Sequence, residues 1–428
     1  MKAIGIDIGT TSVCGVVIDT ASGSVVRSCT RNSDAFLPGC ASWEKIQSVD
    51  TILAVATGIL EDLIADDVAV IGVTGQMHGI VYVDGEGLAV SPLYTWQDER
   101  GNLPYGDTTY AKHLGSCAGY GNVTDFYNRE NGVRPAEAAT YCTIHDYFVM
   151  RLCGRKAPLI HASDAASFGC YDLAENRFTY PCGAQVVADY CIAGAYKGIP
   201  VSVAIGDNQA SVFSTLVDEN SILLNVGTGS QVSIVSDTPV IGENSEVRPY
   251  FEGKYLVVGS ALCGGRAYSL LKDFYAAVLG YAETTDSEQV YEIMDQMLQQ
   301  TDTSSLTVDT RFAGTRSDPR QCGSINGITT ENFTPSQLTR GVLEGMAAEL
   351  FAMYRQMGVD RGGIVGSGNG LRKNPTLVRI FEETFHARMQ TPAHREEAAF
   401  GAALFGLIAC GVFQNAAEAH RLVTYTNL

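Results

Sequence analysis

Basic residues are scarce in this sequence of 428 residues. Lys and Arg number 29 against 47 Asp and Glu, so the formal net charge is −18 at pH 7. Proteins that bind DNA or RNA usually display a basic face to the phosphate backbone, and no run of basic residues offsets the acidic balance here. The composition therefore argues against a nucleic-acid partner.

Long apolar runs are also missing. No stretch approaches the roughly 18 uninterrupted apolar residues of a membrane-spanning helix, so we expect no membrane partner. The N-terminal segment carries one Lys and then enters a strand-like run that contains Asp7, without the separate apolar region of a signal peptide. We expect a cytoplasmic protein. With 46% hydrophobic residues the chain can bury large cores, and its length favours two domains.

Metal-binding spacings are absent as well. The 12 cysteines include no C-x-x-C pair, and the 7 histidines include no pair spaced for one helix face. The chain is too long for a small disulfide scaffold, so we interpret the cysteines as reduced and mostly buried. We expect no zinc site built from protein ligands.

A polar turn between two apolar runs occurs twice, in "IGIDIGTTSVCGVV" and in "ILLNVGTGSQVSIV". Each pattern predicts a β-hairpin. Glycine and hydroxyl residues in a tight turn expose N–H and O–H donors, which phosphate oxygens require. An ordinary glycine hairpin would explain either copy alone, but the matched copies favour two phosphate loops. Aligned, the copies pair Asp7 with Asn225, Gly9 with Gly227, Thr10 with Thr228 and Ser12 with Ser230.

The carboxylate of Asp7 would repel a phosphate at the first turn. Its position is explained if a Mg²⁺ ion lies between the two groups and is held partly through water. Asn225 is neutral at the matching place, so we expect the metal to be organised from the first turn only.

Asp207 is the strongest candidate for a catalytic group. In "IPVSVAIGDNQASVFST" an apolar strand ends at Gly206 and a helical pattern follows. Asp207 could simply cap that helix. A carboxylate at a strand end could also accept the proton of a substrate hydroxyl as that hydroxyl attacks a phosphoryl group, and one side chain can do both.

Two further segments suggest a surface for a polyol. "VIGVTGQMHGIVYVD" has a polar turn that contains Gln76, Met77 and His78, and "LYTWQDERG" carries Trp96 and Asp98. An aromatic ring can cover sugar C–H groups while amide and carboxylate groups bond the hydroxyls. Trp96 could instead be a core anchor, and His78 a histidine that is satisfied within its turn.

In order along the chain, these segments resemble the FGGY family of carbohydrate kinases, within the superfamily of actin, heat-shock ATPases and sugar kinases. The resemblance implies an α/β fold of two actin-like ATPase (ribonuclease H-like) domains that close on a nucleotide at an interdomain active-site cleft. It also implies transfer of the γ-phosphate of Mg-ATP to a sugar hydroxyl. The segments that carry it are "GIDIGTTS", "GVTGQMHGIV", "LYTWQDER", "TIHDYFVMRLCG", "IGDNQASVFS", "LNVGTGSQ", "LCGGRAYSLL", "GSINGITTENFTPSQLTRGVLEGMA" and "VGSGNGLRKN".

The resemblance also assigns roles to residues. Asp207 would be the general base and Asp7 would organise Mg²⁺. The phosphates would be held by Thr10, Thr11, Ser12, Gly227 and Thr228; the nucleoside by Gly264, Gly366, Ser367, Gly368, Asn369 and Asn374; and the sugar by Gln76, Met77, His78, Trp96 and Asp98. Many relatives have Lys or Arg where this chain has Cys14.

Within the family, "TIHDY" and "TWQD" point to members that phosphorylate sedoheptulose to sedoheptulose 7-phosphate. Xylulose, ribulose or a related polyol is the alternative substrate. An actin-type or heat-shock-type ATPase and a catalytically silent sensor are alternatives of other classes, and a homodimer is left open.

The duplication predicts domains of residues 1–206 and 207–428. The first would carry the sugar site and first phosphate loop, and the second would carry the other loop and the adenosine site. Residues 338–358 and 396–411 show apolar positions at spacings of three and four, so both should form helices on the second sheet.

Overall fold

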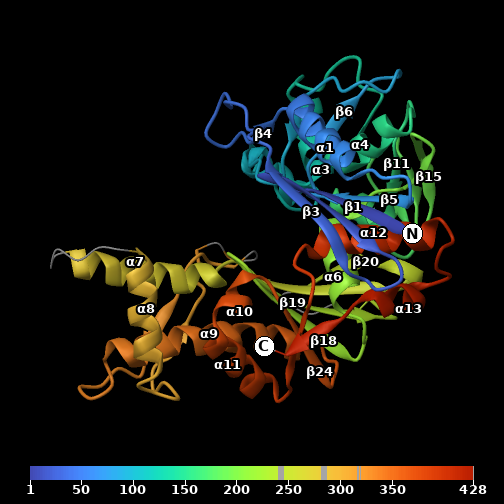
Figure 1. The fold of residues 1–428 in the computed structure, drawn as a ribbon. Coiled ribbons are helices and arrows are strands. Elements are labelled where there is room, and N and C mark those ends of the chain that lie inside the picture. The colour runs from blue at the N-terminus through green and yellow to red at the C-terminus, as the bar shows by residue number, and fades with distance from the viewer. Residues whose placement is uncertain (240–244, 281–286, 316–317, 319, 428) are drawn as a thin grey trace. The chain divides into compact units, whose positions relative to one another are not determined.

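A computed structural model describes residues 1–239, 245–280, 287–315, 318 and 320–427 (Figure 1). The chain forms two compact units, and each is assembled from separate segments. The first unit contains Met1–Val217, Arg248–Tyr255 and His394–Thr424; the second contains Asp218–Val247, Leu256–Ala393 and the chain from Tyr425. A compact unit is not the same as one of the two homologous domains. The predicted boundary between residues 206 and 207 therefore stays a prediction.

The first unit is built on a seven-stranded sheet in the order β15-β16-β5-β1-β2-β3, with β17 also paired to β5. β1 runs antiparallel to β2 and parallel to β5. Its apolar residues are buried from both faces, as expected of a central strand. The bounds are β1 Lys2–Ile8, β2 Ser12–Asp19, β3 Val25–Asn32, β5 Val68–Gly75, β15 Ile192–Tyr196, β16 Ile199–Ser202 and β17 Ile205–Gly206.

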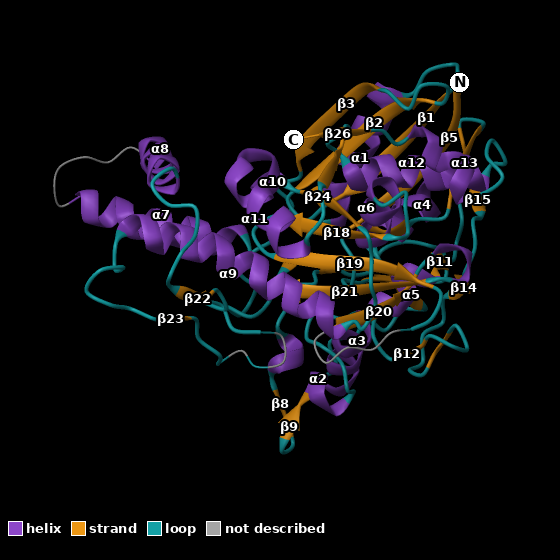
Figure 2. Ribbon diagram, turned by 90° about the horizontal axis from the view of Figure 1, so that it is seen from below, coloured by secondary structure: helices purple, strands orange, loops and turns teal. Residues whose placement is uncertain are grey.

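The second unit repeats this arrangement in the order β20-β21-β19-β18-β24-β25-β26, whose strands lie side by side in Figure 2. β18 runs antiparallel to β19 and parallel to β24, as β1 does to β2 and β5. The repeat seen in the sequence is therefore a repeat of strand order and direction. The bounds are β18 Ser221–Val226, β19 Ser230–Ser236, β20 Ser245–Pro249, β21 Tyr255–Ala261, β24 Gly363–Ser367, β25 Met389–Pro392 and β26 Tyr425–Asn427.

Helix α12 (Glu397–Ala409) packs on β1, β5 and α6 of the first unit. Its surface of Ala and Gly lets it approach the sheet so closely that a Cβ on Gly5 would lie 1.8 Å from the carbonyl oxygen of Ala399. The expectation that this segment covers the second sheet is therefore wrong. The other helices of the unit are α1 Val49–Leu63, α2 Tyr110–His113, α3 Gly121–Glu130, α4 Ile144–Leu152, α5 Ala162–Ser167, α6 Asp207–Thr215 and α13 Ala416–Ala419.

Helix α9 (Pro335–Gln356) belongs to the second unit, as expected. Thr334 caps its N-terminus and Pro335 occupies its first turn. It packs against α11, β19 and β22, and Leu343 and Leu350 enter the apolar core of the unit. The remaining helices and strands there are α7 Gly265–Gly280, α8 Ser287–Leu298, α10 Asn369–Lys373, α11 Pro375–Phe385, β22 Thr307–Asp309 and β23 Ser324–Asn326.

Short strands complete the first unit around its central sheet. They are β4 Ile46–Gln47, β6 Val81–Val83, β7 Leu93–Tyr94, β8 Pro104–Tyr105, β9 Thr108–Thr109, β10 Thr140–Cys142, β11 Leu159–His161, β12 Tyr171–Asp172, β13 Arg177–Phe178 and β14 Gln185–Val187. Within the described ranges, no helix combines the length and apolar character that crossing a membrane requires. All 12 cysteines are free thiols.

Candidate functional site

The turn between β1 and β2 joins residues from two predicted groups. The hydroxyl of Thr10 accepts a hydrogen bond from the indole N–H of Trp96 at 3.0 Å and lies 3.3 Å from Oε1 of Gln76. Gln47, which the sequence did not single out, donates to the carbonyl of Thr10 at 2.6 Å and accepts from Gln76 at 3.0 Å. The structure therefore brings one residue that is predicted to bind phosphate together with two residues that are predicted to bind the sugar.

His78 is held in an unusual backbone conformation. Its φ of 74° lies in the left-handed region, which is uncommon for a residue with a side chain. Its backbone N–H donates to the hydroxyl of Ser167 at 3.1 Å, and its Nδ1 lies 2.8 Å from the carbonyl oxygen of Ser167. The ring stacks on Tyr120 with centroids 4.2 Å apart. Strained residues that many contacts hold in place are concentrated at functional sites.

Asp98 is fully engaged with its neighbours. Its Oδ1 accepts from Nε of Arg100 at 2.6 Å, and its Oδ2 accepts from the backbone N–H of Lys45 at 3.0 Å. Arg100 is itself buried, donates to Asn128 and lies over the ring of Tyr94. The geometry gives Asp98 a structural role, and its contact with a sugar stays a prediction.

Asp207 is the first residue of α6, directly after β17. Gly206 occupies the cap position and pairs with Gly75 at the end of β5. A Cβ on Gly206 would lie 2.7 Å from Sδ of Met77, so that methionine, predicted for the sugar, lies beside the catalytic candidate. Burial raises the pKa of Asp207, while His145 and Arg248 act to lower it.

Asp7 lies near the same place, one residue before the end of β1. It lies opposite Thr74 of β5 and opposite Cys14 of β2. Burial, with smaller contributions from Asp207 and Glu396, raises the pKa of Asp7 to about 7. Its Oδ1 is buried and lacks a hydrogen-bond partner among the described residues. Burial also raises the pKa of Cys14 to about 12, so the thiol adds no charge there.

Three further buried residues, which the sequence did not single out, lie close to one another in the first unit. His145 and Asp146 are in the first turn of α4 and Asp164 is in the first turn of α5. Their ligand atoms lie within 4.8 Å of one another, and His145 Nε2 is 3.0 Å from Asp164 Oδ1, without hydrogen-bond geometry. Helix N-termini favour negative charge, which accounts for carboxylates at these places. Burial raises the pKa of both carboxyl groups well above the usual range, so protons can neutralise the cluster.

In the second unit the turn at 227–229 is anchored by its carbonyl groups. The backbone N–H groups of Gly265 and Arg266, at the start of α7, donate to Gly227 at 2.9 Å and to Thr228 at 3.0 Å. A Cβ on Gly264 would lie 2.4 Å from the backbone of Gly229. Gly227 and Thr228 are exposed at the turn, as a ligand loop requires.

The glycine turn after β24 lies against the same hairpin. Ser367 is fully buried, and its hydroxyl accepts from Asn225 at 2.6 Å. Gly368 has a φ of 87°, and a Cβ there would lie 2.5 Å from the carbonyl oxygen of Val226. Asn374 caps α11 by accepting from the N–H of Leu377 at 2.9 Å, which is a structural role. The predicted nucleoside residues Gly366–Asn369 are therefore adjacent to the second phosphate turn, and a contact of Asn374 with the nucleoside stays a prediction.

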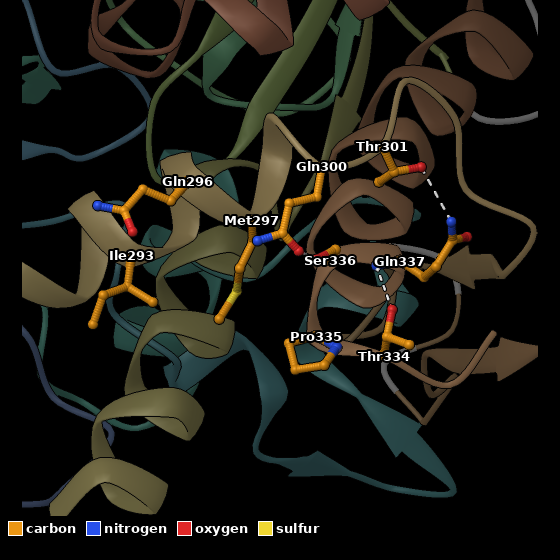
Figure 3. Close-up of a pocket in the computed structure, with 9 residues that line it drawn as sticks. All are labelled: Ile293, Gln296, Met297, Gln300, Thr301, Thr334, Pro335, Ser336 and Gln337. Atoms are coloured by element: carbon orange, nitrogen blue, oxygen red, sulfur yellow. Dashed lines mark hydrogen bonds between the residues drawn. The ribbon is translucent and has the colours of Figure 1, made fainter. Parts of the chain in front are cut away.

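A separate pocket of about 470 Å³ lies between α8 and the start of α9 (Figure 3). Its polar groups are bonded to one another: the Gln337 amide donates to Thr301 at 3.1 Å, and the Ser336 hydroxyl donates to Gln300 at 2.7 Å. No predicted site residue is among those that line it, so we assign it no role.

Comparison with known families matches residues 2–103 to the N-terminal domain, and residues 222–410 to the C-terminal domain, of the FGGY family of carbohydrate kinases. The sedoheptulokinases of Mus musculus and Homo sapiens are each 30% identical to the chain, over 94% of its length and 96% of theirs.

Two solved structures illustrate the shared fold. The xylulose kinase from Rhodospirillum rubrum superposes with a TM-score of 0.85 at 20% identity, covering 100% of this chain and 93% of that one. The Plasmodium falciparum glycerol kinase with ADP superposes with a TM-score of 0.74 at 15% identity, covering 98% of this chain and 92% of that one. At these identities the likeness concerns the fold alone.

Proposed function

Because this chain belongs to the FGGY family of carbohydrate kinases, we propose that it transfers the γ-phosphate of Mg-ATP to sedoheptulose and forms sedoheptulose 7-phosphate. Family membership makes the chain an ATP-dependent sugar kinase. It also confirms the resemblance seen in the sequence and the expected actin-like ATPase fold. The choice of ketose is supported by the two relatives at 30% identity.

The observation that carries the mechanism is the position of Asp207 at the start of α6, beside Met77. We propose that its carboxylate accepts the proton of the sugar hydroxyl while the hydroxyl oxygen forms a bond to the γ-phosphorus. The bond between the γ-phosphorus and the bridging oxygen breaks, and ADP leaves with that oxygen. Burial raises the pKa of Asp207, and His145 and Arg248 oppose that rise, which helps the carboxyl to reach the ionised form that a base needs.

Asp7 fits a role in holding Mg²⁺. Its Oδ1 is a buried oxygen without a partner in the described part of the chain, and an oxygen ligand is what this ion prefers. The ion would neutralise charge on the phosphates during transfer. Burial, with smaller contributions from Asp207 and Glu396, raises the pKa of Asp7, and a bound cation would favour its ionised form.

Each unit would bind part of ATP with its own residues. In the first unit, Thr10, Thr11 and Ser12 would donate to phosphate oxygens. In the second, Gly227 and Thr228 would do the same, while Gly264 and Gly366–Asn369 would let the backbone approach the nucleoside. Phosphoryl transfer depends mainly on such positioning and on charge stabilisation.

Another ketose or polyol, such as xylulose or ribulose, is the alternative substrate. An ATPase that acts on no sugar is disfavoured by the bond between Thr10 and Trp96, because it ties the phosphate turn to an aromatic face that such a protein would not need. We further propose a cytoplasmic location, where ATP is supplied, and leave the homodimer as an assembly to be tested in solution.

The test is ADP release from Mg-ATP in the presence of sedoheptulose, D-xylulose, D-ribulose, L-ribulose or glycerol. We expect sedoheptulose to give the highest kcat/KM, and Asp207→Asn to lower kcat by roughly 10²-fold to 10⁴-fold. If no sugar raises ADP release above the basal rate, the proposal fails. If Asp207→Asn keeps most of the activity, the base is another group.

A further inference from the structure

We propose that helix α5 (Ala162–Ser167) positions two parts of the site at once: Ser163 at its start fixes the backbone that carries Asp207, and Ser167 at its end fixes His78. Both serines are positioning residues that act through their neighbours. The inference rests on the proposed function, because it assigns Asp207 to the base and His78 to the sugar.

At the start of α5, the hydroxyl of Ser163 accepts a hydrogen bond from the backbone N–H of Gly206 at 3.0 Å. Gly206 immediately precedes Asp207. The backbone N–H of Ser163 donates to Nδ1 of His161 at 3.1 Å, and the Ser163 hydroxyl lies 2.9 Å from that nitrogen. Because Nδ1 accepts from this N–H, it carries no proton, and the Ser163 hydroxyl can only donate to it. The hydroxyl oxygen then keeps a lone pair that accepts from the N–H of Gly206. The bond therefore orients the peptide that leads into Asp207.

At the end of α5, Ser167 makes two bonds to His78. Its hydroxyl accepts from the backbone N–H of His78, and its carbonyl oxygen lies 2.8 Å from Nδ1 of the ring. A carbonyl can only accept, so Nδ1 carries the proton and Nε2 of a neutral ring is an acceptor. Ser167 thereby sets the backbone conformation, the ring position and the tautomer of His78.

The helix between these ends is suited to act as a rigid spacer. Ser163, Asp164 and Ala165 are fully buried, and Ser167 is nearly so. Asp164 lies against His145, and the Ser167 hydroxyl donates to the carbonyl of Asp164 at 2.7 Å. A serine with only a local structural role would need no more than such a bond within its own helix. The additional bonds to Gly206 and His78 join segments 43 and 89 residues away.

Steady-state kinetics can distinguish the roles of the two serines. Losing one buried hydrogen bond typically costs a factor of about 5 to 100 in the step that depends on it. We expect Ser163→Ala to lower kcat by about that factor with KM for the sugar within twofold, because it displaces the base. We expect Ser167→Ala to raise KM for the sugar by a similar factor with a smaller change in kcat, because it removes the hydroxyl that accepts from the backbone N–H of His78 while the carbonyl contact with Nδ1 is kept.

Ser214→Ala is the matched control, since Ser214 is a buried helical serine of the same unit and, among the described residues, its hydroxyl bonds only within its own helix, at 3.0 Å. We expect it to leave both constants within twofold of the wild type. Thermal unfolding of each variant separates loss of folded protein from a change in the site. A double variant, His78→Ala with Ser167→Ala, should show little more loss than His78→Ala alone, because Ser167 acts through His78.

The inference is overturned if the wild type is active but the two serine variants change kcat and KM in the same pattern, or if Ser167→Ala and His78→Ala have additive effects. A wild type that phosphorylates no sugar is a different result, because it refutes the proposed function and the roles assigned to α5 with it.

Discussion

The indole N–H of Trp96 donates a 3.0 Å hydrogen bond to the hydroxyl of Thr10. Trp96 is 46% exposed, so its ring is not a core anchor. A residue expected to contact a sugar therefore holds a residue expected to contact phosphate, and the same hydroxyl lies beside Gln76. Binding of either ligand should be sensitive to this bond.

Trp96→Phe tests the bond while it keeps an aromatic face. A typical hydrogen bond contributes about 0.5 to 1.5 kcal/mol, so we expect KM for the sugar to rise roughly twofold to tenfold, with a smaller rise in KM for ATP. Steady-state kinetics with each substrate varied in turn measure both. Trp96→Ala should raise KM for the sugar further, because the face is lost as well. Equal constants for Phe and Ala would contradict a role of the ring.

Asp7 and Asn225, each the last residue but one of the strand before its turn, should contribute unequally. Asp7→Asn should lower Mg-ATP turnover by about 100-fold or more, because a charged metal ligand is lost. Asn225→Ala should cost about tenfold or less, since its amide makes one bond to Ser367. Turnover titrated with Mg²⁺ is the measurement, and Asp7→Asn should also require more Mg²⁺. Equal losses in the two variants would refute the asymmetry.

Asp7→Asn should also stabilise the folded protein when Mg²⁺ and nucleotide are absent from the solution. The pKa of Asp7 is raised to about 7 in the folded chain from a usual value near 3.8, so folding takes up a proton between these values. Stability from this group is present at low pH and is lost as pH rises through 7. Asp7→Asn should therefore raise the free energy of unfolding by about 2 to 4 kcal/mol at pH 8.

Urea denaturation in EDTA at pH 8 and at pH 4 measures this difference. At pH 4 the carboxyl is protonated in the folded state, so Asp7→Asn should have little effect there. A gain of equal size at both pH values would mean that charge is not the cause.

Asp98→Asn separates the structural role of this carboxylate from a role in binding sugar. Removing one charge of its buried pair with Arg100 should lower the free energy of unfolding by about 3 to 5 kcal/mol. We expect KM for the sugar to change little in the fraction that stays folded. A clear rise in KM with unchanged stability would instead support the sugar contact expected from the sequence. Kinetics and urea denaturation on one preparation give both values.

Close packing under α12 should be intolerant of a methyl group. A Cβ on Gly72 would lie 1.8 Å from the carbonyl oxygen of Ala402. Gly72→Ala should therefore destabilise the protein by about 3 kcal/mol or more, because backbone has to move. Gly85→Ala is the control, since no heavy atom of the described residues outside its chain neighbours lies within 4 Å of its Cβ position, and we expect a change below about 1 kcal/mol. Comparable destabilisation in both would contradict the packing argument.

The hairpins and the position of Asp207 could be predicted because their signals are local. Turn residues between two apolar runs specify a hairpin within about a dozen positions, and an apolar strand followed by Gly206 and Asp207 marks a strand end. The duplicated pattern also predicted that the two turns occupy equivalent places in the two sheets. The strand orders of the two sheets confirm this.

Residues whose role depends on distant partners could not be predicted. Gln47 and Ser163 have no distinctive neighbours in sequence, and only the folded chain brings them to Thr10 and Gly206. The location of α12 was mispredicted for a related reason. Periodicity indicates that a helix is buried, but it does not indicate which sheet receives it, and here complementary glycines on β1 and β5 decide.

The placement of α12 affects the order in which the chain can be completed during synthesis. In the first unit, β1 is synthesised before the second unit, whereas α12 and α13 are synthesised after nearly all of it. Until His394–Thr424 has left the ribosome, the strip of β1 and β5 that contains Gly5 and Gly72 lacks its covering helix. The nascent first unit therefore has to wait, partly uncovered, while all but the last few residues of the second are being synthesised.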